Sequence, residues 1–263
     1  MSIAVIGVGA MGTAIVHGLM EAGWERLDLR LADASVERVE ALLADGHIAY
    51  SDPTIAAESA EVVLLAVKPQ VMDAVLGELA PVITPRHLVV SIAAGITTAG
   101  IEAVLGAVPV VRCMPNTPAL VGKGMTGLAP GTHATEAHLA RAEELLAAVG
   151  QTVVVEEHQL DAVTGVSGSG PAYVFLLAEA LEEAAIAEGI APEHARLLAE
   201  QTVAGAGALL DSSPMTAEEL RRQVTSPNGT TEAALRSLEN DAFRRVMRGA
   251  VRAATERSRE LGA

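Results

Sequence analysis

Residues 3–12 read IAVIGVGAMG, an apolar tetrapeptide followed by three glycines with the spacing G-x-G-x-x-G. The spacing alone is a weak signal, but here it follows a predicted buried strand and precedes a helix expected from Met11. In this context Gly7 permits a tight turn, and Gly9 allows a pyrophosphate to approach the backbone closely. Gly12 allows the helix to pack closely against the strand. The stretch therefore predicts a dinucleotide-binding turn.

An acidic residue stands where such sites bind the adenosine ribose. Asp33 follows Gly12 by about 20 residues, at the end of the second predicted strand. A carboxylate there accepts a hydrogen bond from the ribose 2′-hydroxyl and repels a 2′-phosphate, which favours NADH over NADPH. However, Ser35 and Arg38 could accommodate a phosphate, and Asp33 could instead cap the helix that begins near Ser35. The choice between NADH and NADPH stays open.

Short apolar runs alternate with amphipathic stretches through the first half of the chain. Strands without polar residues are typically covered on both faces, which indicates a parallel sheet with helices on either side. The second half, from residue 160, shows helical patterns only. We expect strands at 3–6, 27–32, 62–67, 88–92, 108–113 and 151–155, and helices at 11–22, 36–44, 173–188, 192–210, 217–224, 231–238 and 242–261.

These elements predict an α/β fold in two domains. Residues 1–160 would form a Rossmann-type, doubly wound, mostly parallel sheet that binds a dinucleotide. Residues 161–263 would form an all-α domain whose helices are rich in Ala. A bundle of about 100 residues has a small core, and pairing with a second copy would complete it.

Composition excludes several classes of protein. A formal net charge of -15 makes nucleic acid an unsuitable partner, although backbone N–H groups can still hold a cofactor phosphate. The lone Cys113 forms no internal disulfide and offers no metal-ligand spacing, so we expect no metal and a reducing, cytoplasmic setting. Residues 88–101 and 163–178 are shorter than the ~18 apolar residues of a membrane span, so we expect no membrane association.

Small or rigid residues follow the predicted strands, at the edge where doubly wound sheets bind ligands. Lys68 is the only charged residue of these loops, and it either approaches a ligand or is solvated. Asn116 lies between two prolines, where it serves either turn chemistry or ligand contact. The loops are Lys68-Pro69, Ala93-Ala94-Gly95 and Met114-Pro115-Asn116-Thr117-Pro118.

Several longer motifs occur in a fixed order: AVKP at 66–69, SIAAG at 91–95, MPNTP at 114–118, VSGSGPAY at 166–173 and TSPNGTT at 225–231. Together with the glycine turn, they resemble the motifs of pyrroline-5-carboxylate reductases over nearly the whole chain. The resemblance implies reduction of 1-pyrroline-5-carboxylate to L-proline by NADPH or NADH, the last step of proline biosynthesis. It also implies a helical dimerisation domain, an active site between the Rossmann domain and helices of the dimer partner, and homodimers that commonly assemble into decamers as pentamers of dimers.

The resemblance also assigns residues. Asn228 departs from the family, because it replaces a glycine, but Asn tolerates a positive φ. Asp33 departs too, since NADPH-preferring relatives often have Ser there. Substrate would contact Glu157, Ser226, Gly229, Thr230 and Thr231. With Asp33 and Asn116 added, the cofactor set is Ile6, Gly7, Val8, Gly9, Ala10, Met11, Gly12, Asp33, Ala66, Val67, Lys68, Pro69, Ile92, Ala93, Ala94 and Asn116.

The loop of residues 226–231 leads directly into a helix expected from Thr231. Its backbone N–H groups and the helix N-terminus would hold the substrate carboxylate. The Thr231 hydroxyl, the expected catalytic group, would hydrogen-bond the ring nitrogen and relay a proton. Spacing alone would instead make Thr230 or Thr231 a helix N-cap.

Two other functions fit a dinucleotide site. An imine reductase or 3-hydroxyacid dehydrogenase would act on another small substrate, but the hydroxyacid enzymes use a Lys early in the second domain as acid and base. The expected helix at 173–188 contains no Lys. A non-enzymatic nucleotide sensor would not need a substrate loop such as residues 226–231.

Overall fold

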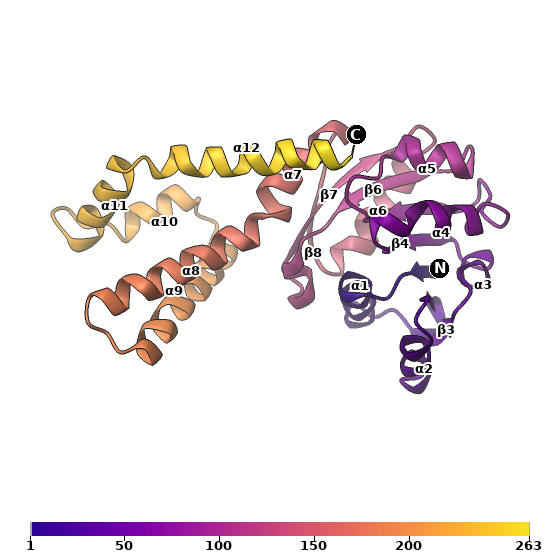
Figure 1. Ribbon diagram of the computed structural model, residues 1–263, viewed down its shortest axis with the longest axis horizontal. Helices are drawn as coiled ribbons and strands as arrows, with labels where there is room; N and C mark the ends of the chain where they lie inside the picture. Colours follow the sequence, from indigo (N-terminus) through magenta and orange to yellow (C-terminus); the bar gives the residue numbers. More distant parts are fainter. Residues whose placement is uncertain (1, 263) are drawn as a thin grey trace. The chain divides into compact units, whose positions relative to one another are not determined.

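The computed structural model describes residues 2–262 of the 263, which divide into two compact units. Among the described residues, one unit comprises residues 2–169 with 253–262, and the other comprises Gly170–Arg252. The first unit thus extends past residue 160, where the sequence pattern changes. Figure 1 shows the elements of both units, coloured along the chain.

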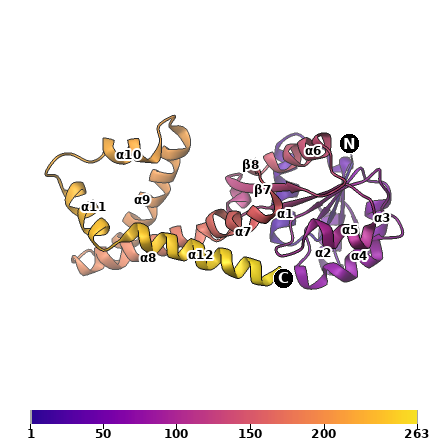
Figure 2. The ribbon, with the colours of Figure 1, turned by 90° about the horizontal axis from the view of Figure 1, so that it is seen from above.

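An eight-stranded sheet forms the centre of the first unit (Figure 2). Neighbouring strands are parallel from β3 to β6, β7 is antiparallel to β6, and β8 is parallel to β7. The mostly parallel, doubly wound sheet predicted from the sequence is therefore confirmed. Its order is β3 (Ile48–Tyr50), β2 (Leu29–Ala32), β1 (Ile3–Ile6), β4 (Val62–Leu65), β5 (Leu88–Ser91), β6 (Val110–Met114), β7 (Gly124–Pro130) and β8 (Gly150–Val154).

Helices cover both faces of this sheet. Successive strand residues point to opposite faces, so Leu64 packs on one side and Leu65 on the other, both fully buried. Each such side chain contributes about 1.5–3 kcal/mol by leaving water. One face packs against α1 (Ala10–Glu21), α2 (Val36–Ala44) and α6 (Glu136–Ala147), and the other against α3 (Pro53–Glu58), α4 (Met72–Leu79) and α5 (Thr98–Leu105).

Two strands, β3 and β7, were not expected from the sequence. β7 reads GMTGLAP, a composition that does not favour strands. Its Gly127 is required by close packing, because a Cβ there would approach the Val163 side chain to 2.9 Å. Conversely, residues 27–28, expected as the start of the strand at 27–32, belong to a 3-10 turn at Arg26–Asp28 before β2.

The first unit also contains α7 (Leu160–Val163), a π-turn at Thr164–Gly168, and the last turns of α12 (Phe243–Leu261). The Ser258 hydroxyl on α12 donates a hydrogen bond to Asp161 Oδ1 at 2.7 Å. A Cβ on Gly95 would lie 3.0 Å from the Leu261 carbonyl oxygen. The end of α12 therefore packs against the loop after β5.

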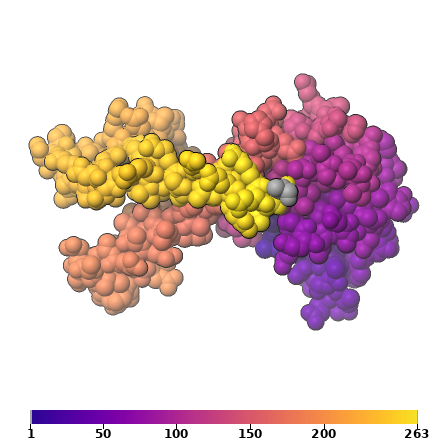
Figure 3. Space-filling model, turned by 45° about the horizontal axis from the view of Figure 1, so that its top comes forward, coloured from indigo at the N-terminus to yellow at the C-terminus, as the bar shows by residue number. Residues whose placement is uncertain are grey.

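The second unit is all-α, as predicted, and no strand occurs between residues 160 and 262. It contains α8 (Gly170–Ala187), α9 (Pro192–Ser212), α10 (Ala217–Gln223), α11 (Thr230–Asn240) and the start of α12. Helices α8 and α9 expose large apolar side chains, with Phe175 63% and Leu197 64% exposed. In Figure 3 these helices are the red-orange and orange segments. Among the described residues, no helix has the length and apolar composition of a membrane span.

Candidate active site

The three glycines of the first βα turn have the geometry that the sequence predicts. Gly7 has φ +93°, and a Cβ on it would approach the Ala66 backbone to 2.9 Å. A Cβ on Gly12 would collide with the Gly7 carbonyl oxygen. Gly9 caps α1, and a Cβ on it would have no neighbour within 4 Å, so its outer side is open to a ligand.

The N-terminus of α1 is suited to an anion. The first N–H groups of an α-helix have no partner within the helix, and the helix dipole places partial positive charge there. No side chain caps α1, and its first turn contains no acidic residue. The residues present therefore fit the pyrophosphate of a dinucleotide.

Asp33 lies just past the end of β2 and is held by three donors. The Val8 N–H and Arg38 Nη1 each donate to Oδ2 at 2.8 Å, and the Ser35 N–H donates to Oδ1 at 3.0 Å. Burial opposes ionisation, but the hydrogen bonds from Ser35, Arg38 and Val8 outweigh it and lower the pKa of Asp33. The carboxylate therefore braces the glycine turn. It does not cap α2, because Ser35 caps that helix.

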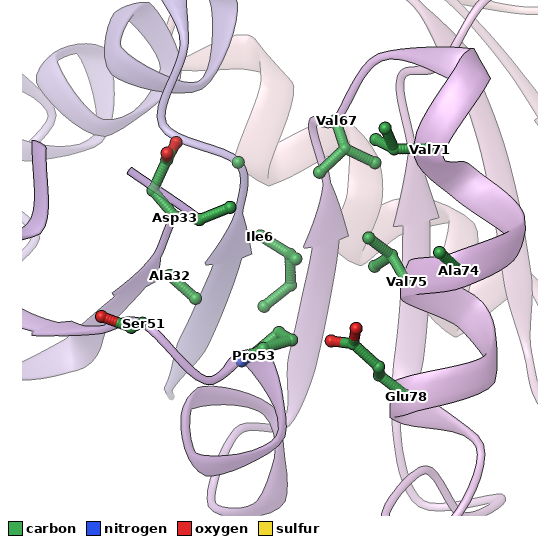
Figure 4. Close-up of a pocket in the computed structure, with 12 residues that line it drawn as sticks. Ile6, Ala32, Asp33, Ser51, Pro53, Val67, Val71, Ala74, Val75 and Glu78 are labelled. Atoms are coloured by element: carbon green, nitrogen blue, oxygen red, sulfur yellow. The ribbon is translucent and has the colours of Figure 1, made fainter. Parts of the chain in front are cut away.

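A pocket of about 400 Å³ opens beside Asp33 (Figure 4). Its walls are mainly apolar, and α4 forms one side, with Val75 and Glu78 facing the strands. An apolar pocket with a few polar groups is typical of sites for flat rings. Because the β1–β3 half of a Rossmann sheet binds one mononucleotide, this pocket fits the adenosine. Its lining is Ile6, Gly7, Ala32, Asp33, Ala34, Ser51, Pro53, Val67, Val71, Ala74, Val75 and Glu78.

The sequence did not indicate the α4 side of this pocket. Val71, Ala74, Val75 and Glu78 line it, but no helix was expected at Met72–Leu79. The apolar residues of α4 are a possible signal, since Met72, Leu76 and Leu79 recur at helical spacing and are buried.

The other predicted cofactor loops follow β4, β5 and β6, whose carboxyl ends share one edge of the sheet. Ala66 and Val67 are half-buried, Ala93 is buried, and Ala94 is exposed. Lys68 is exposed, which leaves its two interpretations open.

Asn116 is hydrogen-bonded to the backbone of two other segments of the first unit. Its Oδ1 accepts a hydrogen bond from the Met125 N–H at 2.8 Å, and its Nδ2 donates to the Ser167 carbonyl at 3.0 Å. The residue is only 9% exposed. A direct contact with a ligand would have to compete with these bonds.

Glu157 is also engaged within the first unit. Its two carboxylate oxygens accept hydrogen bonds from the N–H and the hydroxyl of Thr98, each at 2.8 Å. The buried Arg112 forms an ion pair with Oε1 at 3.3 Å. Glu157 therefore anchors the N-terminus of α5, and a substrate would have to share this carboxylate.

The other predicted substrate residues lie in one loop of the second unit. Asn228 has φ 59°, as its tolerance of positive φ predicts, and its N–H donates to Glu232 Oε2 at 2.6 Å. Gly229 is the N-cap of α11, which begins at Thr230, one residue earlier than expected. The N-cap interpretation of the threonines is therefore wrong. Among residues 2–262, the hydroxyls of Thr230 and Thr231 have no hydrogen-bond partner.

Comparisons with known proteins cover both units. A family model described as pyrroline-5-carboxylate reductase dimerisation matches residues 157–261, and one described as NADP oxidoreductase coenzyme F420-dependent matches residues 2–95. A pyrroline-5-carboxylate reductase from Pseudomonas aeruginosa is 45% identical, over 98% of this chain and 96% of that protein.

Comparison with solved structures points to the same family as the sequence comparisons. A pyrroline-5-carboxylate reductase from Coxiella burnetii has a TM-score of 0.95 at 39% identity, covering 100% of this chain and 98% of that one. A Plasmodium falciparum pyrroline carboxylate reductase with NADP bound has a TM-score of 0.84 at 28% identity. That comparison covers 100% of this chain and 98% of the Plasmodium chain. The chain therefore belongs to the pyrroline-5-carboxylate reductase family.

Proposed function

We propose that this enzyme reduces 1-pyrroline-5-carboxylate to L-proline with NADPH or NADH, as the last step of proline biosynthesis. One observation carries the proposal beyond family membership. The loop of residues 226–231 leads into α11 through the left-handed Asn228, and the hydroxyls of Thr230 and Thr231 have no partner among the described residues. A helix N-terminus with unengaged hydroxyl groups suits a small carboxylate that also carries a ring nitrogen.

The glycine turn and the pocket beside Asp33 would hold the dinucleotide. Residues 6–12 would bind its pyrophosphate, and Asp33 its adenosine ribose. When bound, the reduced dinucleotide supplies a hydride. The predicted contacts of residues 66–69 and 92–94 would then position the nicotinamide half. Asn116, by contrast, would act through the backbone groups that it binds.

The substrate requires little acid catalysis. Its ring nitrogen is an imine, and protonation makes the C=N carbon an electrophile that accepts a hydride. The product amine keeps the proton on nitrogen, so one hydride and one proton are consumed for each L-proline formed. Thr231 would hydrogen-bond the nitrogen and relay that proton, while the backbone N–H groups of Thr230 and Thr231 in the first turn of α11 hold the carboxylate.

The alternative, an imine reductase or 3-hydroxyacid dehydrogenase acting on another substrate, is not favoured. The hydroxyacid enzymes require a Lys as acid and base early in the helical domain. α8 contains none.

We further propose that residues 1–160 and 161–263 act as the nucleotide-binding and the dimerisation domain, and that the protein works in the cytoplasm as a homodimer or a pentamer of dimers. The exposed apolar side chains of α8 and α9 support pairing with a second copy, because such faces are normally buried in obligate dimers. Sedimentation at micromolar concentration tests this, and a sharp monomer peak would contradict it.

The activity is tested by following oxidation of NADPH and NADH at 340 nm after addition of pyrroline-5-carboxylate. Thr231→Ala should lower turnover by about ten- to a thousand-fold, since the lost hydrogen bond is worth ~1.4–4 kcal/mol. Thr231→Ser retains the hydroxyl and is the matched control. Unchanged turnover in Thr231→Ala would remove this residue from the mechanism.

A further inference from the structure

The Ser167 carbonyl lies at an unusual point of the backbone. In an α-helix it would accept a hydrogen bond from the N–H four residues later, but that residue is Pro171, which has no N–H. The chain also widens here into a π-turn, in which the Ser169 N–H donates to the Thr164 carbonyl at 2.8 Å. Such turns occur frequently at functional sites.

Asn116 supplies the donor that Pro171 lacks. Its Nδ2 donates to the Ser167 carbonyl at 3.0 Å across 51 residues of sequence, while its Oδ1 accepts from the Met125 N–H on β7. Both ends of the amide are therefore used, and the side chain is nearly buried. A buried amide with both ends bonded fixes its neighbours in one arrangement.

The segment that Asn116 holds also packs closely on the sheet. A Cβ on Gly168 would lie 3.1 Å from Met114 Cε, at the carboxyl end of β6. A Cβ on Gly127 of β7 would lie 3.0 Å from a Leu160 methyl group. There is little space for residues 164–168 to shift without breaking these contacts.

A Rossmann sheet binds the second mononucleotide of its cofactor at the carboxyl ends of β4, β5 and β6. In this protein that mononucleotide would be the nicotinamide half. Resting on the proposed function, we propose that Asn116 is a positioning residue for hydride transfer, which holds the backbone of residues 164–168 as a fixed wall for the nicotinamide ring. Asn116 itself does not touch the cofactor. Hydride transfer depends steeply on ring placement, and a misplacement of about 1 Å can cost about a hundred-fold in rate.

Asn116→Ala removes both hydrogen bonds, and Asn116→Asp removes only the donor to Ser167 while keeping an acceptor for Met125. We expect both variants to bind NADPH with a dissociation constant within about three-fold of wild type, because the glycine turn and the adenosine pocket are intact. The fluorescence lifetime of bound NADPH should shorten, since the ring is less restrained. Hydride transfer in a single turnover with pyrroline-5-carboxylate should slow by about ten- to a hundred-fold.

Two further variants separate positioning from general destabilisation. Thr135→Ala removes the cap of α6 and lowers stability away from this segment, so its NADPH lifetime and hydride rate should match wild type. Pro171→Ala restores a backbone N–H at residue 171. In the double variant with Asn116→Ala, Pro171→Ala should partly restore the fluorescence lifetime of bound NADPH, because the residue 171 N–H can then donate to the Ser167 carbonyl.

A wild-type lifetime and hydride rate in both Asn116 variants would overturn the proposal. An equally shortened NADPH lifetime and slowed hydride transfer in Thr135→Ala would also overturn it. So would a lifetime that Pro171→Ala does not restore in part when it is combined with Asn116→Ala. If wild-type enzyme fails to oxidise NADPH with pyrroline-5-carboxylate, the proposed function fails, but the lifetime measurement still decides the role of Asn116.

Discussion

Arg38→Ala should reduce the use of NADPH much more than the use of NADH. Arg38 Nη1 lies 2.8 Å from Oδ2 of Asp33, which lines the adenosine pocket, and the Arg38 side chain is 47% exposed. Without Arg38, the Ser35 and Val8 N–H groups still bind the Asp33 carboxylate. A 2′-phosphate would then face an uncompensated negative charge.

The size of the effect follows from simple electrostatics. At a separation of ~6 Å and an effective dielectric constant of ~40, one pair of unit charges interacts by about 1.4 kcal/mol, a ten-fold effect. The phosphate carries nearly two charges, but salt screens an exposed guanidinium. We therefore expect the ratio of kcat/KM for NADPH to kcat/KM for NADH to fall by about 5- to 20-fold.

Initial rates with both cofactors, measured on one preparation, give this ratio independently of the fraction of folded enzyme. Arg141→Ala is the matched control, because it removes an exposed arginine of α6 that pairs with Glu144. It should leave the ratio unchanged. An unchanged or increased ratio in Arg38→Ala would refute the electrostatic argument.

Three further predictions concern cofactor binding at the glycine turn, the pH dependence of stability and the accessibility of the buried thiol. Gly12→Ala should abolish measurable NADPH binding in fluorescence titration, because the new Cβ collides with the Gly7 carbonyl; binding at wild-type affinity would contradict this geometry. Burial chiefly lowers the pKa of His87, so the free energy of unfolding should decrease as pH falls below ~6.5, by at most ~1.4 kcal/mol per pH unit. Urea unfolding at several pH values measures this decrease, and a His87→Gln variant that is equally sensitive to pH would exclude this residue as the cause. Burial raises the pKa of the Cys113 thiol, so mass spectrometry should detect labelling by N-ethylmaleimide only after unfolding, and rapid labelling of folded enzyme would disprove it.

The sequence predicted the elements whose signals are local. α2 has the expected bounds, Val36–Ala44, because Ser35 is a good cap and its apolar residues have helical spacing. β1 was predicted correctly because four buried residues precede a glycine turn. β7 was missed because its glycines are required by close packing with other segments: Gly127 packs against α7, and Gly124 packs against Val149 and Ala119.

The same distinction applies to the site. The glycine turn and the left-handed Asn228 follow from residue type and spacing, and both have the expected geometry. The bonds of Asn116 to Ser167 and of Glu157 to Thr98 span 51 and 59 residues, so only the folded chain reveals them. Short-range patterns thus indicate which residues belong to the candidate site, whereas tertiary contacts determine what the side chains of those residues bind.

The apolar faces of α8 and α9 have a consequence for biosynthesis of the enzyme. With the proposed pairing of two copies, a newly released chain presents Phe175 and Leu197 to solvent until a second chain covers them. Assembly then competes with chaperone capture and aggregation, and it is second order in chain concentration. Slow expression in a dilute host would therefore reduce the yield of active enzyme even when every chain folds correctly.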